Sequence, residues 1–409
     1  MGREDENQKK LELYLHIPFC IRKCDYCDFL SMPVEEKVRR HYVNVLQEEI
    51  KRKAAFCREY QISSVFWGGG TPSILSGEQV QELMESLRKN FSLEPEAEIT
   101  LECNPGTLEE EKLACYREAG VNRLSIGLQS AINEELKRLG RVHTVEQFLE
   151  NFSLARRKGF ENINVDLISA LPGQNIWNWE YTLRRVLELR PEHLSAYSLI
   201  VEEGTPFYEW YGEDEKRRAQ GEEPKVLPGE ETERKMYEMT RELLEEKGYQ
   251  RYEISNYAMP GKECRHNLGY WQCVSYLGLG LGSASLMEEM RFLNTDSLED
   301  YLKGEFGDLG KILQRDPETL KRERVQVLDQ KQQIEEFMFL GLRVMEGVSK
   351  KEFFKRFGRE LAEVYGEELK KFQSQGLLAQ RGSRVFLTEK GIDVSNYVMS
   401  GFLNPLSDQ

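Results

Sequence analysis

The chain has 409 residues, with 70 acidic and 56 basic side chains and a formal net charge of -14. This length allows about two to four domains at roughly 100–200 residues each. Such an acidic chain is a poor candidate for binding nucleic acid, which needs lysine and arginine to neutralise phosphates. The mean hydropathy is -0.59, and no long apolar run occurs. We therefore expect no transmembrane helix and, because the polar N-terminus lacks the apolar stretch of a secretory signal, a cytoplasmic location.

The first 200 residues alternate between strand and helix patterns. Six short apolar segments have the composition of strands covered on both faces, at 12–17, 62–67, 97–103, 121–126, 162–168 and 193–199. Helical patterns follow them at about 34–59, 76–90, 107–119, 143–158, 175–190 and 230–248. This succession predicts a parallel α/β sheet with right-handed crossovers. The rhythm leaves open whether the sheet is doubly wound or curves into an incomplete barrel.

Composition divides the chain into three expected parts. Residues 1–250 hold the strand and helix alternation, with a charged surface insertion expected at 209–229. A motif-rich extension follows at 251–325. Residues 326–409 carry a helix pair and then a hairpin at 378–387, which predicts a small α+β, winged-helix-like C-terminal domain. This domain has no dominant basic stripe, so we do not expect it to bind DNA.

Three of the eight cysteines, Cys20, Cys24 and Cys27, fall within eight positions. In a chain without an export signal, clustered thiols indicate metal ligands or catalysts. A four-ligand zinc site would need a fourth ligand, and none lies at a familiar spacing. Three thiolates in one loop suit an iron–sulfur cubane whose fourth iron stays open to a small ligand. A zinc-stabilised α/β protein is the alternative, which iron and sulfide analysis would distinguish.

Glycines and polar residues also lie at or just beyond the carboxyl ends of the other predicted strands. Gly68-Gly69-Gly70-Thr71-Pro72 comes directly after the second strand, where glycines let the backbone approach a ligand. Late in the later strands, or just beyond them, lie Glu102, Gln129, Arg141, Asp166, Tyr197 and Ile200. The carboxyl ends of parallel strands form the ligand site in both barrels and open sheets. Carboxylates, a guanidinium and amides together suit a zwitterionic ligand with hydroxyls and a positive centre.

These residues carry a resemblance to a known family. LYLHIPFCIRKCDYC, GGGTP and the strand-end residues resemble the radical S-adenosylmethionine superfamily, in the branch of oxygen-independent coproporphyrinogen III oxidases and haem chaperones, over residues 12–402. The resemblance implies an incomplete (β/α)6 barrel, a [4Fe–4S] cluster on the three cysteines, and S-adenosylmethionine bound to the open iron through its amino and carboxylate groups. The cofactor contacts that it implies are Tyr14, Gly69, Gly70, Thr71, Glu102, Gln129, Arg141, Asp166, Ile200 and Ala284.

Departures from the oxidase pattern favour the chaperone side of this branch. Phe29 stands where the oxidases resembling this family carry one more Cys, and their longer segment before the first strand is absent. His266-Asn267-Leu-Gly-Tyr270-Trp271 resembles the hallmark HNxxYW string of the chaperones. A His beside aromatic rings suits an axial haem ligand, although His266 could instead hold a loop against the barrel. Ala284 stands where many chaperones of this branch have His.

The resemblance leaves two functions to distinguish. The first is a haem chaperone, which would bind haem beside the cluster and S-adenosylmethionine and deliver it to acceptor haemoproteins such as respiratory cytochromes. The alternative is an anaerobic coproporphyrinogen III oxidase, which would use a radical from S-adenosylmethionine for oxidative decarboxylation to protoporphyrinogen. The sequence does not decide whether the chain is an enzyme, and it leaves a homodimer possible. No nucleic-acid partner is expected.

Overall fold

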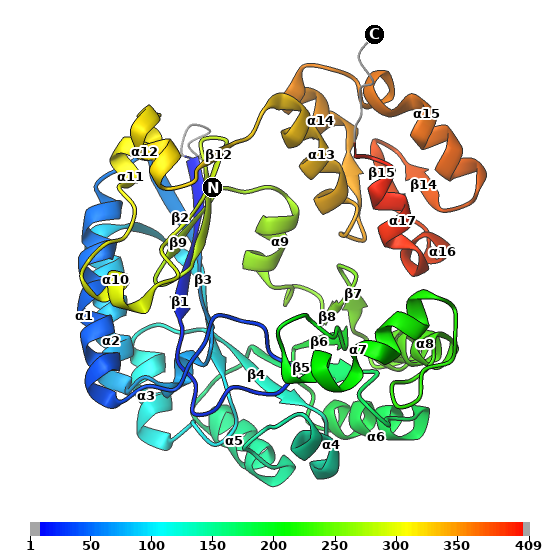
Figure 1. The fold of residues 1–409 in the computed structure, drawn as a ribbon, viewed down its shortest axis with the longest axis horizontal. Coiled ribbons are helices and arrows are strands. Elements are labelled where there is room, and N and C mark those ends of the chain that lie inside the picture. The colour runs from blue at the N-terminus through cyan, green and yellow to red at the C-terminus, as the bar shows by residue number, and fades with distance from the viewer. Residues whose placement is uncertain (1–8, 404–409) are drawn as a thin grey trace.

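The computed structural model describes residues 9–403, and its centre is a run of six neighbouring parallel strands (Figure 1). In chain order these are β1 Lys9–Ile17, β2 Tyr60–Gly69, β3 Ser92–Cys103, β4 Arg123–Gln129, β5 Ile163–Ser169 and β6 His193–Ser198. Each of them pairs in parallel with the next one along the chain. The six predicted strands are therefore confirmed, with β1 and β3 beginning several residues earlier than the apolar pattern indicated.

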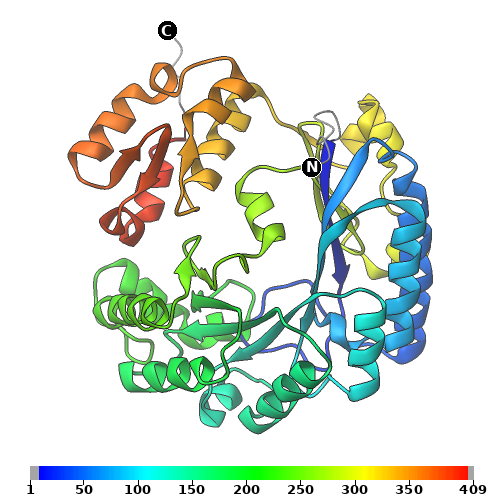
Figure 2. The ribbon, with the colours of Figure 1, turned by 180° about the vertical axis from the view of Figure 1, so that it is seen from behind.

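Helices cover the outer face of this curved sheet (Figures 1 and 2). They are α1 Glu36–Ala54, α2 Gly77–Asn90, α3 Glu110–Glu118, α4 Asn133–Arg138, α5 Val145–Arg157 and α6 Ile176–Leu187. Local chemistry sets several of their ends. Ser76 and Thr144 each form a capping box with the glutamine three residues later. Gly120 and Gly159 follow α3 and α5 with φ of 87° and 81°, in the left-handed region that glycine adopts at low cost.

The sheet continues past both ends of the six-stranded run without closing. Beyond β1 lie β9 Tyr276–Leu279, β10 Ala284–Met287, β11 Met290–Leu293 and β12 Gln326–Val327, and beyond β6 lie β8 Asn256–Ala258 and β7 Gln250–Arg251. Of these six, β9 runs parallel to its neighbour β1, and the others pair antiparallel. Among the described strands β1 and β6 do not pair with each other, so the barrel is incomplete, as expected.

The charged segment 209–229 differs from the expected insertion, because its first half belongs to helix α7 Pro206–Ala219. The Thr205 side chain caps this helix, and proline stands at its first position. The Asp214 carboxylate then accepts hydrogen bonds from the amides of residues 225–227 at 2.7–3.0 Å, which holds the loop that follows. Helix α8 Glu230–Glu246 comes next and confirms the last predicted helix of this region.

The C-terminal part forms a small α+β unit with its own hydrophobic core. Its elements are α13 Gln330–Gly341, β13 Val348–Ser349, α14 Lys350–Phe357, α15 Leu361–Ser374, β14 Leu378–Arg381, β15 Arg384–Leu387, α16 Glu389–Asp393 and α17 Ser395–Ser400. The three strands pair antiparallel in the order β13-β15-β14. The predicted hairpin and winged-helix-like domain are thereby confirmed. The boundaries 1–250, 251–325 and 326–409 stay predictions, although β9–β12 extend the sheet of the first part.

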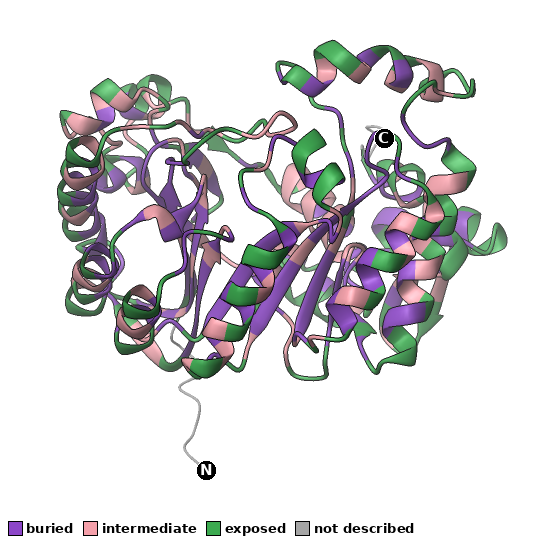
Figure 3. Cartoon of the chain, turned by 90° about the horizontal axis from the view of Figure 1, so that it is seen from below, coloured by how far each residue is buried: buried purple, intermediate pink, exposed green. Residues whose placement is uncertain are grey.

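The C-terminal unit lies across the open side of the barrel, between β12 and β7 (Figures 1 and 2). Ion pairs join it to both sheet extensions, from Glu336 to Arg291 at 2.9 Å and from Glu389 to Arg251 at 2.7 Å. Helix α9 Arg265–Trp271 lies inside the curve of the sheet, and three short helices, α10 Leu298–Leu302, α11 Leu309–Leu313 and α12 Pro317–Arg322, lie near α1. Figure 3 shows mostly buried strands beneath outward-exposed helices. No helix within residues 9–403 is long and apolar enough to cross a bilayer.

Candidate functional site

A cavity of about 490 Å³ lies at the carboxyl ends of the six parallel strands. It is lined by the loop that follows β1 and by residues at the ends of β2 to β6. Because parallel strands end at the same edge, residues far apart in the chain meet there. The lining includes these predicted site residues: Cys20, Cys24, Cys27, Gly69, Gly70, Thr71, Glu102, Gln129, Arg141, Asp166 and Ile200.

The cysteine loop is irregular, but backbone hydrogen bonds hold it at several points. The Cys20 amide donates to the Met32 carbonyl at 3.2 Å, which closes the base of the loop. Further along, the Asp25 amide donates to Leu139 O at 3.2 Å and the Asp25 carbonyl accepts from Phe207 at 3.0 Å. A Cβ at Gly140 would clash with the Asp25 carboxylate, so the loop packs directly on the turn after α4. The thiols therefore stand on a fixed support.

The three thiols are free, with Cys20 buried and Cys24 and Cys27 partly exposed to the cavity. Burial raises the pKa of the Cys20 and Cys27 thiols above the ordinary value. Within residues 9–403, no three His, Cys, Asp or Glu side chains are arranged to hold one metal ion. A cubane does not need such convergence, because each thiolate binds a different iron. Three thiols on one loop beside a cavity are thus the donor set that a [4Fe–4S] cluster requires.

Arg141 places a fixed positive charge beside this loop. Its Nη2 donates to Asn104 Oδ1 at 2.8 Å and to the Gly127 carbonyl at 2.7 Å, while Nη1 lies 3.6 Å from Cys24 Sγ. The buried Nε has no hydrogen-bond partner in the described part of the chain. Because Arg141 lines the cavity, its guanidinium is placed to pair with an anionic group of a ligand.

Two carboxyl groups face the same cavity. Burial, and then the nearby Asp166, raises the pKa of Glu102 to about 8. Asp166 accepts hydrogen bonds from Ser125 Oγ at 2.9 Å and from Asn164 Nδ2 at 2.8 Å, and burial raises its pKa as well. Desolvated carboxyl groups of this kind favour a ligand that brings positive charge or hydroxyl donors.

The glycines of GGGTP are required by packing as well as by the cavity. Gly69 has φ of 110°, and a Cβ there would lie 2.6 Å from His16 Cε1. A Cβ at Gly70 would lie 2.6 Å from the Phe19 carbonyl oxygen. Only glycine at these two positions lets the loop pack against the end of β1 and the residues that follow it. Gln129 also has a left-handed φ of 73°, which is uncommon for a residue other than glycine and is typical of functional sites.

Tyr14, Ala284 and His266 do not belong to the cavity lining. Tyr14 lies behind Gly68 and shares a hydrogen bond with His16 Nδ1 at 3.1 Å. Ala284 begins β10 and pairs with Leu293, several strands from the ends of β3 to β6. A role of Tyr14 or Ala284 in binding S-adenosylmethionine therefore stays a prediction without support from this geometry.

His266 is enclosed inside the barrel on α9. Its Nδ1 lies 2.8 Å from Ser64 Oγ and its Nε2 lies 3.0 Å from Tyr270 Oη, while the ring stacks on Phe66 with centroids 5.1 Å apart. Burial, and then Arg123, lowers the pKa of His266 to about 3, so the ring is neutral. Both ring nitrogens are thus occupied. This arrangement matches the alternative in which His266 holds a segment inside the barrel, and haem ligation by His266 stays a prediction.

The lining also includes residues that the sequence analysis did not propose for the site. Asn104 bridges two predicted ones, because its Nδ2 donates to Thr71 Oγ1 at 2.7 Å while its Oδ1 accepts from Arg141. It follows β3 directly, so the strand-end rule could have identified it. Tyr26 lies between two cysteines of the loop and packs on Phe207. No spacing rule singles out such a residue.

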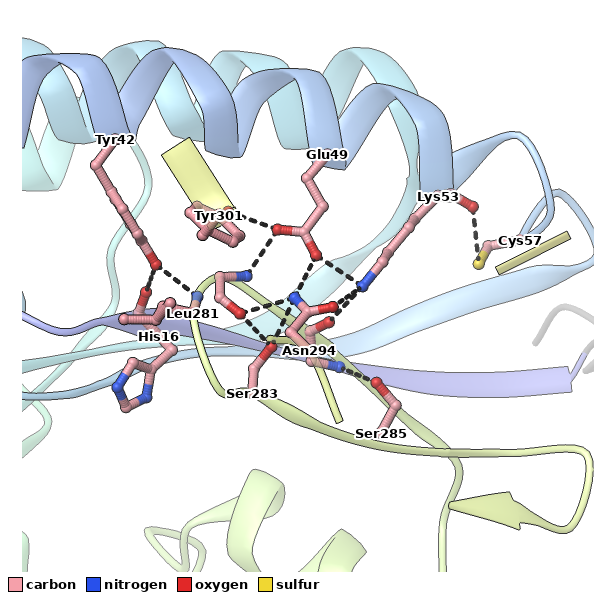
Figure 4. A network of polar contacts seen from close by, with 12 residues as sticks. His16, Tyr42, Glu49, Lys53, Cys57, Leu281, Ser283, Ser285, Asn294 and Tyr301 are labelled. Carbon is pink, nitrogen blue, oxygen red and sulfur yellow. Dashed lines mark hydrogen bonds and ion pairs between the residues drawn. The ribbon is translucent and has the colours of Figure 1, made fainter. Parts of the chain in front are cut away.

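A buried polar network supports the loop from behind (Figure 4). Glu49 on α1 pairs with Lys53 at 2.7 Å and accepts the Gly280 amide at 2.9 Å. Tyr42, on the same helix, donates to the His16 carbonyl at 2.7 Å and accepts from the Leu281 amide. The network thereby fixes the turn between β9 and β10 against the end of β1, from which the cysteine loop departs.

Comparison with protein families identifies two regions of the chain. Residues 14–186 match the radical SAM superfamily, and residues 328–394 match the HemN C-terminal domain. Membership of the radical SAM superfamily implies a [4Fe–4S] cluster and S-adenosylmethionine as cofactors. The three thiols, the guanidinium of Arg141 and the desolvated carboxyl groups that line the cavity suit these two groups.

Curated relatives match over nearly the whole length. The heme chaperone HemW of Bacillus subtilis is 38% identical over 96% of this chain and 99% of its own, and that of Lactococcus lactis is 36% identical over 97% and 98%. The solved structure of coproporphyrinogen III oxidase (HemN) from Escherichia coli has the same fold, with a TM-score of 0.79, 24% identity and coverage of 98% of this chain and 91% of that one. The chain therefore belongs to the heme chaperone HemW family of the radical SAM superfamily.

Proposed function

We propose that this protein is a haem chaperone, which binds haem together with a [4Fe–4S] cluster and S-adenosylmethionine and delivers the haem to acceptor haemoproteins such as respiratory cytochromes. The observation that carries the proposal is the full-length similarity to proteins named heme chaperone HemW. Phe29, at the position where oxidases of the branch carry a further Cys, supports the same assignment.

In this proposal one set of cavity residues binds the cluster and another set binds S-adenosylmethionine. Cys20, Cys24 and Cys27 would hold three irons of the cluster, which leaves the fourth iron open to the amino and carboxylate groups of S-adenosylmethionine. Arg141 would pair with the carboxylate, because its guanidinium is held in place and lines the cavity. Glu102 and Asp166 would accept from the ribose hydroxyls or face the sulfonium charge.

The first test is an anaerobic haemin titration of the cluster-reconstituted protein, followed by absorbance. We expect saturable one-to-one binding that survives in the presence of S-adenosylmethionine. Absence of saturable binding would contradict the proposal. His266→Ala, measured alongside, tests haem ligation by this residue, since haem affinity equal to that of the wild type with an intact cluster would exclude His266 as a ligand.

The second candidate is an anaerobic coproporphyrinogen III oxidase. The cofactor cavity favours it, because the three cysteines, Arg141 and the desolvated Glu102 are the groups that a radical enzyme would also use to hold its cluster and S-adenosylmethionine. Incubation with coproporphyrinogen III, S-adenosylmethionine and a strong reductant under strict anaerobiosis tests it. Formation of protoporphyrinogen would establish this activity, and its absence with the cluster reduced would exclude this substrate.

A further inference from the structure

Large apolar side chains are exposed around the mouth of the cofactor cavity. Ile21, Phe29 and Ile200 are 58%, 64% and 69% exposed. Phe29 and Ile200 line the cavity, and Ile21 stands between the lining residues Cys20 and Arg22. Single exposed apolar residues occur elsewhere, as at Trp177 on α6, and need no explanation. Here Phe29 and Ile200, from two segments about 170 residues apart, line one opening, and Ile21 adjoins two of its lining residues in sequence. Such a gathering indicates a surface that an apolar ligand covers.

Two cations adjoin this apolar rim. Arg22 and Lys23 line the mouth beside Ile21. The nearest carboxylate to Arg22 is that of Asp25, at the outer limit of an ion pair at 4.0 Å, and Lys23 has no ion pair within residues 9–403. Asp28 and Glu202 also line the mouth, so its charge is divided. A ligand with a flat apolar body and anionic groups on one edge complements this pattern, with its anionic edge on Arg22 and Lys23.

The two cofactors limit where such a ligand can lie. About 490 Å³ is within the range of a site for one small molecule, and the cysteine loop and strand ends have to accommodate both a cluster and S-adenosylmethionine there. With the cysteines and the strand-end residues engaged by the cluster and S-adenosylmethionine, the exposed rim is the part of the lining left for a third ligand. A haem that binds together with both cofactors therefore has to lie on the rim.

The rim also determines how haem would be held. The chain has five histidines, and none of them lines the cavity. His16, His143, His193 and His266 are buried elsewhere, and His41 lies on the outer helix α1. The mouth therefore offers apolar side chains and cations to a haem, but no imidazole to ligate its iron.

From these observations we propose that haem lies across the mouth of the cavity, with its face on Phe29, Ile21 and Ile200 and its propionates on Arg22 and Lys23, without histidine ligation. This inference rests on the proposed haem-chaperone function and names the surface that carries it out. Haem at this position would cover the cofactor cavity and would shield the cluster and S-adenosylmethionine from water.

The test is an anaerobic haemin titration of the reconstituted wild type and of Phe29→Ser/Ile21→Ser and Arg22→Glu/Lys23→Glu. Losing two apolar contacts should weaken haemin binding by about tenfold or more. Reversing the two cations should weaken it by about fivefold. The matched controls lie on α14, where Phe354→Ser removes another exposed phenylalanine and Lys351→Glu/Lys355→Glu reverses two exposed lysines. The controls should bind haemin as the wild type does.

Two further measurements keep the outcome clear. Iron and sulfide content has to match the wild type in each rim variant, because Phe29 lies close to Cys27. Haem dimethyl ester, which lacks the anionic edge, should bind the wild type and Arg22→Glu/Lys23→Glu equally. If the wild type binds haemin and both rim variants with intact clusters bind it as tightly, the rim is not the site, and the chaperone proposal stands. If the wild type binds no haemin, both proposals fail.

Discussion

The guanidinium of Arg141 lies 3.6 Å from the thiol of Cys24, measured from Nη1 to Sγ. The two residues are 117 positions apart in the chain, and the parallel strands bring them to the same end of the sheet. Arginine keeps its charge at any pH at which the protein folds. A permanent cation therefore stands at the border between the cysteine loop and the cavity, where we expect it to contact both cofactors.

Replacing Arg141 by lysine should weaken the binding of S-adenosylmethionine by about tenfold or more, because hydrogen bonds to charged groups contribute about 1.5–3 kcal/mol. Lysine keeps the charge but cannot make the forked contact. Iron content should not change. Equilibrium dialysis of reconstituted protein with S-adenosylmethionine measures the effect, and Arg157→Lys on the exposed side of α5 serves as control. Equal affinity in Arg141→Lys and the control would contradict the assignment.

The affinity for S-adenosylmethionine should rise with pH between about 6 and 8. Glu102 has a pKa of about 8 in the described structure, so it is mostly protonated at pH 7. A sulfonium cation favours the ionised form, and binding then releases a proton. Below pH 8, lowering the pH by one unit should therefore weaken the binding of S-adenosylmethionine by up to about tenfold. Above pH 8, where Glu102 is already ionised, this contribution no longer changes the affinity. Calorimetric titration in buffers across this range measures the slope. Glu102→Gln should reduce it without abolishing it, because the amino group of S-adenosylmethionine also has to lose a proton to bind iron. A slope unchanged in that variant would exclude Glu102 as its source.

Cys27→Ser should remove most of the iron and acid-labile sulfide from anaerobically reconstituted protein. Loss of one of three thiolates leaves an iron of the cluster without its protein ligand. Cys115→Ser is the matched control, since Cys115 is a partly buried free thiol on α3. Colorimetric iron and sulfide assays compare the two. Zinc without sulfide in the wild type would instead favour the zinc-stabilised alternative.

Glu49→Ala should destabilise the fold by about 3–5 kcal/mol, because it leaves the buried ammonium of Lys53 without its counter-charge. Urea unfolding followed by circular dichroism gives the free energy. Glu238→Ala, at an exposed position of α8, should change it by less than about 0.5 kcal/mol. The turn at Gly280 would also lose the acceptor of its amide, so iron content should fall in Glu49→Ala. A loss of stability below about 1 kcal/mol would show that the network is not needed.

Much of the fold and of the site could be predicted because both follow from the parallel sheet. Strands such as β4 and β5, buried on both faces, appear in the sequence as short apolar runs. Once six of them alternate with helices, their carboxyl ends meet, and Glu102, Gln129 and Asp166 are brought together without further information.

What could not be predicted depends on short elements and distant contacts. Strand β9 has four residues, too few to show a period, yet it pairs in parallel with β1 more than 250 positions earlier. The enclosure of His266 by Ser64 and Tyr270 likewise joins separate parts of the chain. Helix α7 was not predicted because its sequence is highly charged and indicates a surface insertion. Its glutamates and lysines are in fact spaced to form ion pairs within one helical turn.

The most direct test of the chaperone function is haem transfer. Protein loaded with cluster, S-adenosylmethionine and haem is mixed anaerobically with an excess of an apo b-type cytochrome, and the acceptor's haem absorbance is followed. Apomyoglobin in a parallel reaction measures spontaneous haem release. We predict that the cytochrome fills faster than apomyoglobin does and that its rate rises with acceptor concentration. Equal rates for both acceptors, independent of their concentration, would mean that haem only dissociates, and would contradict delivery.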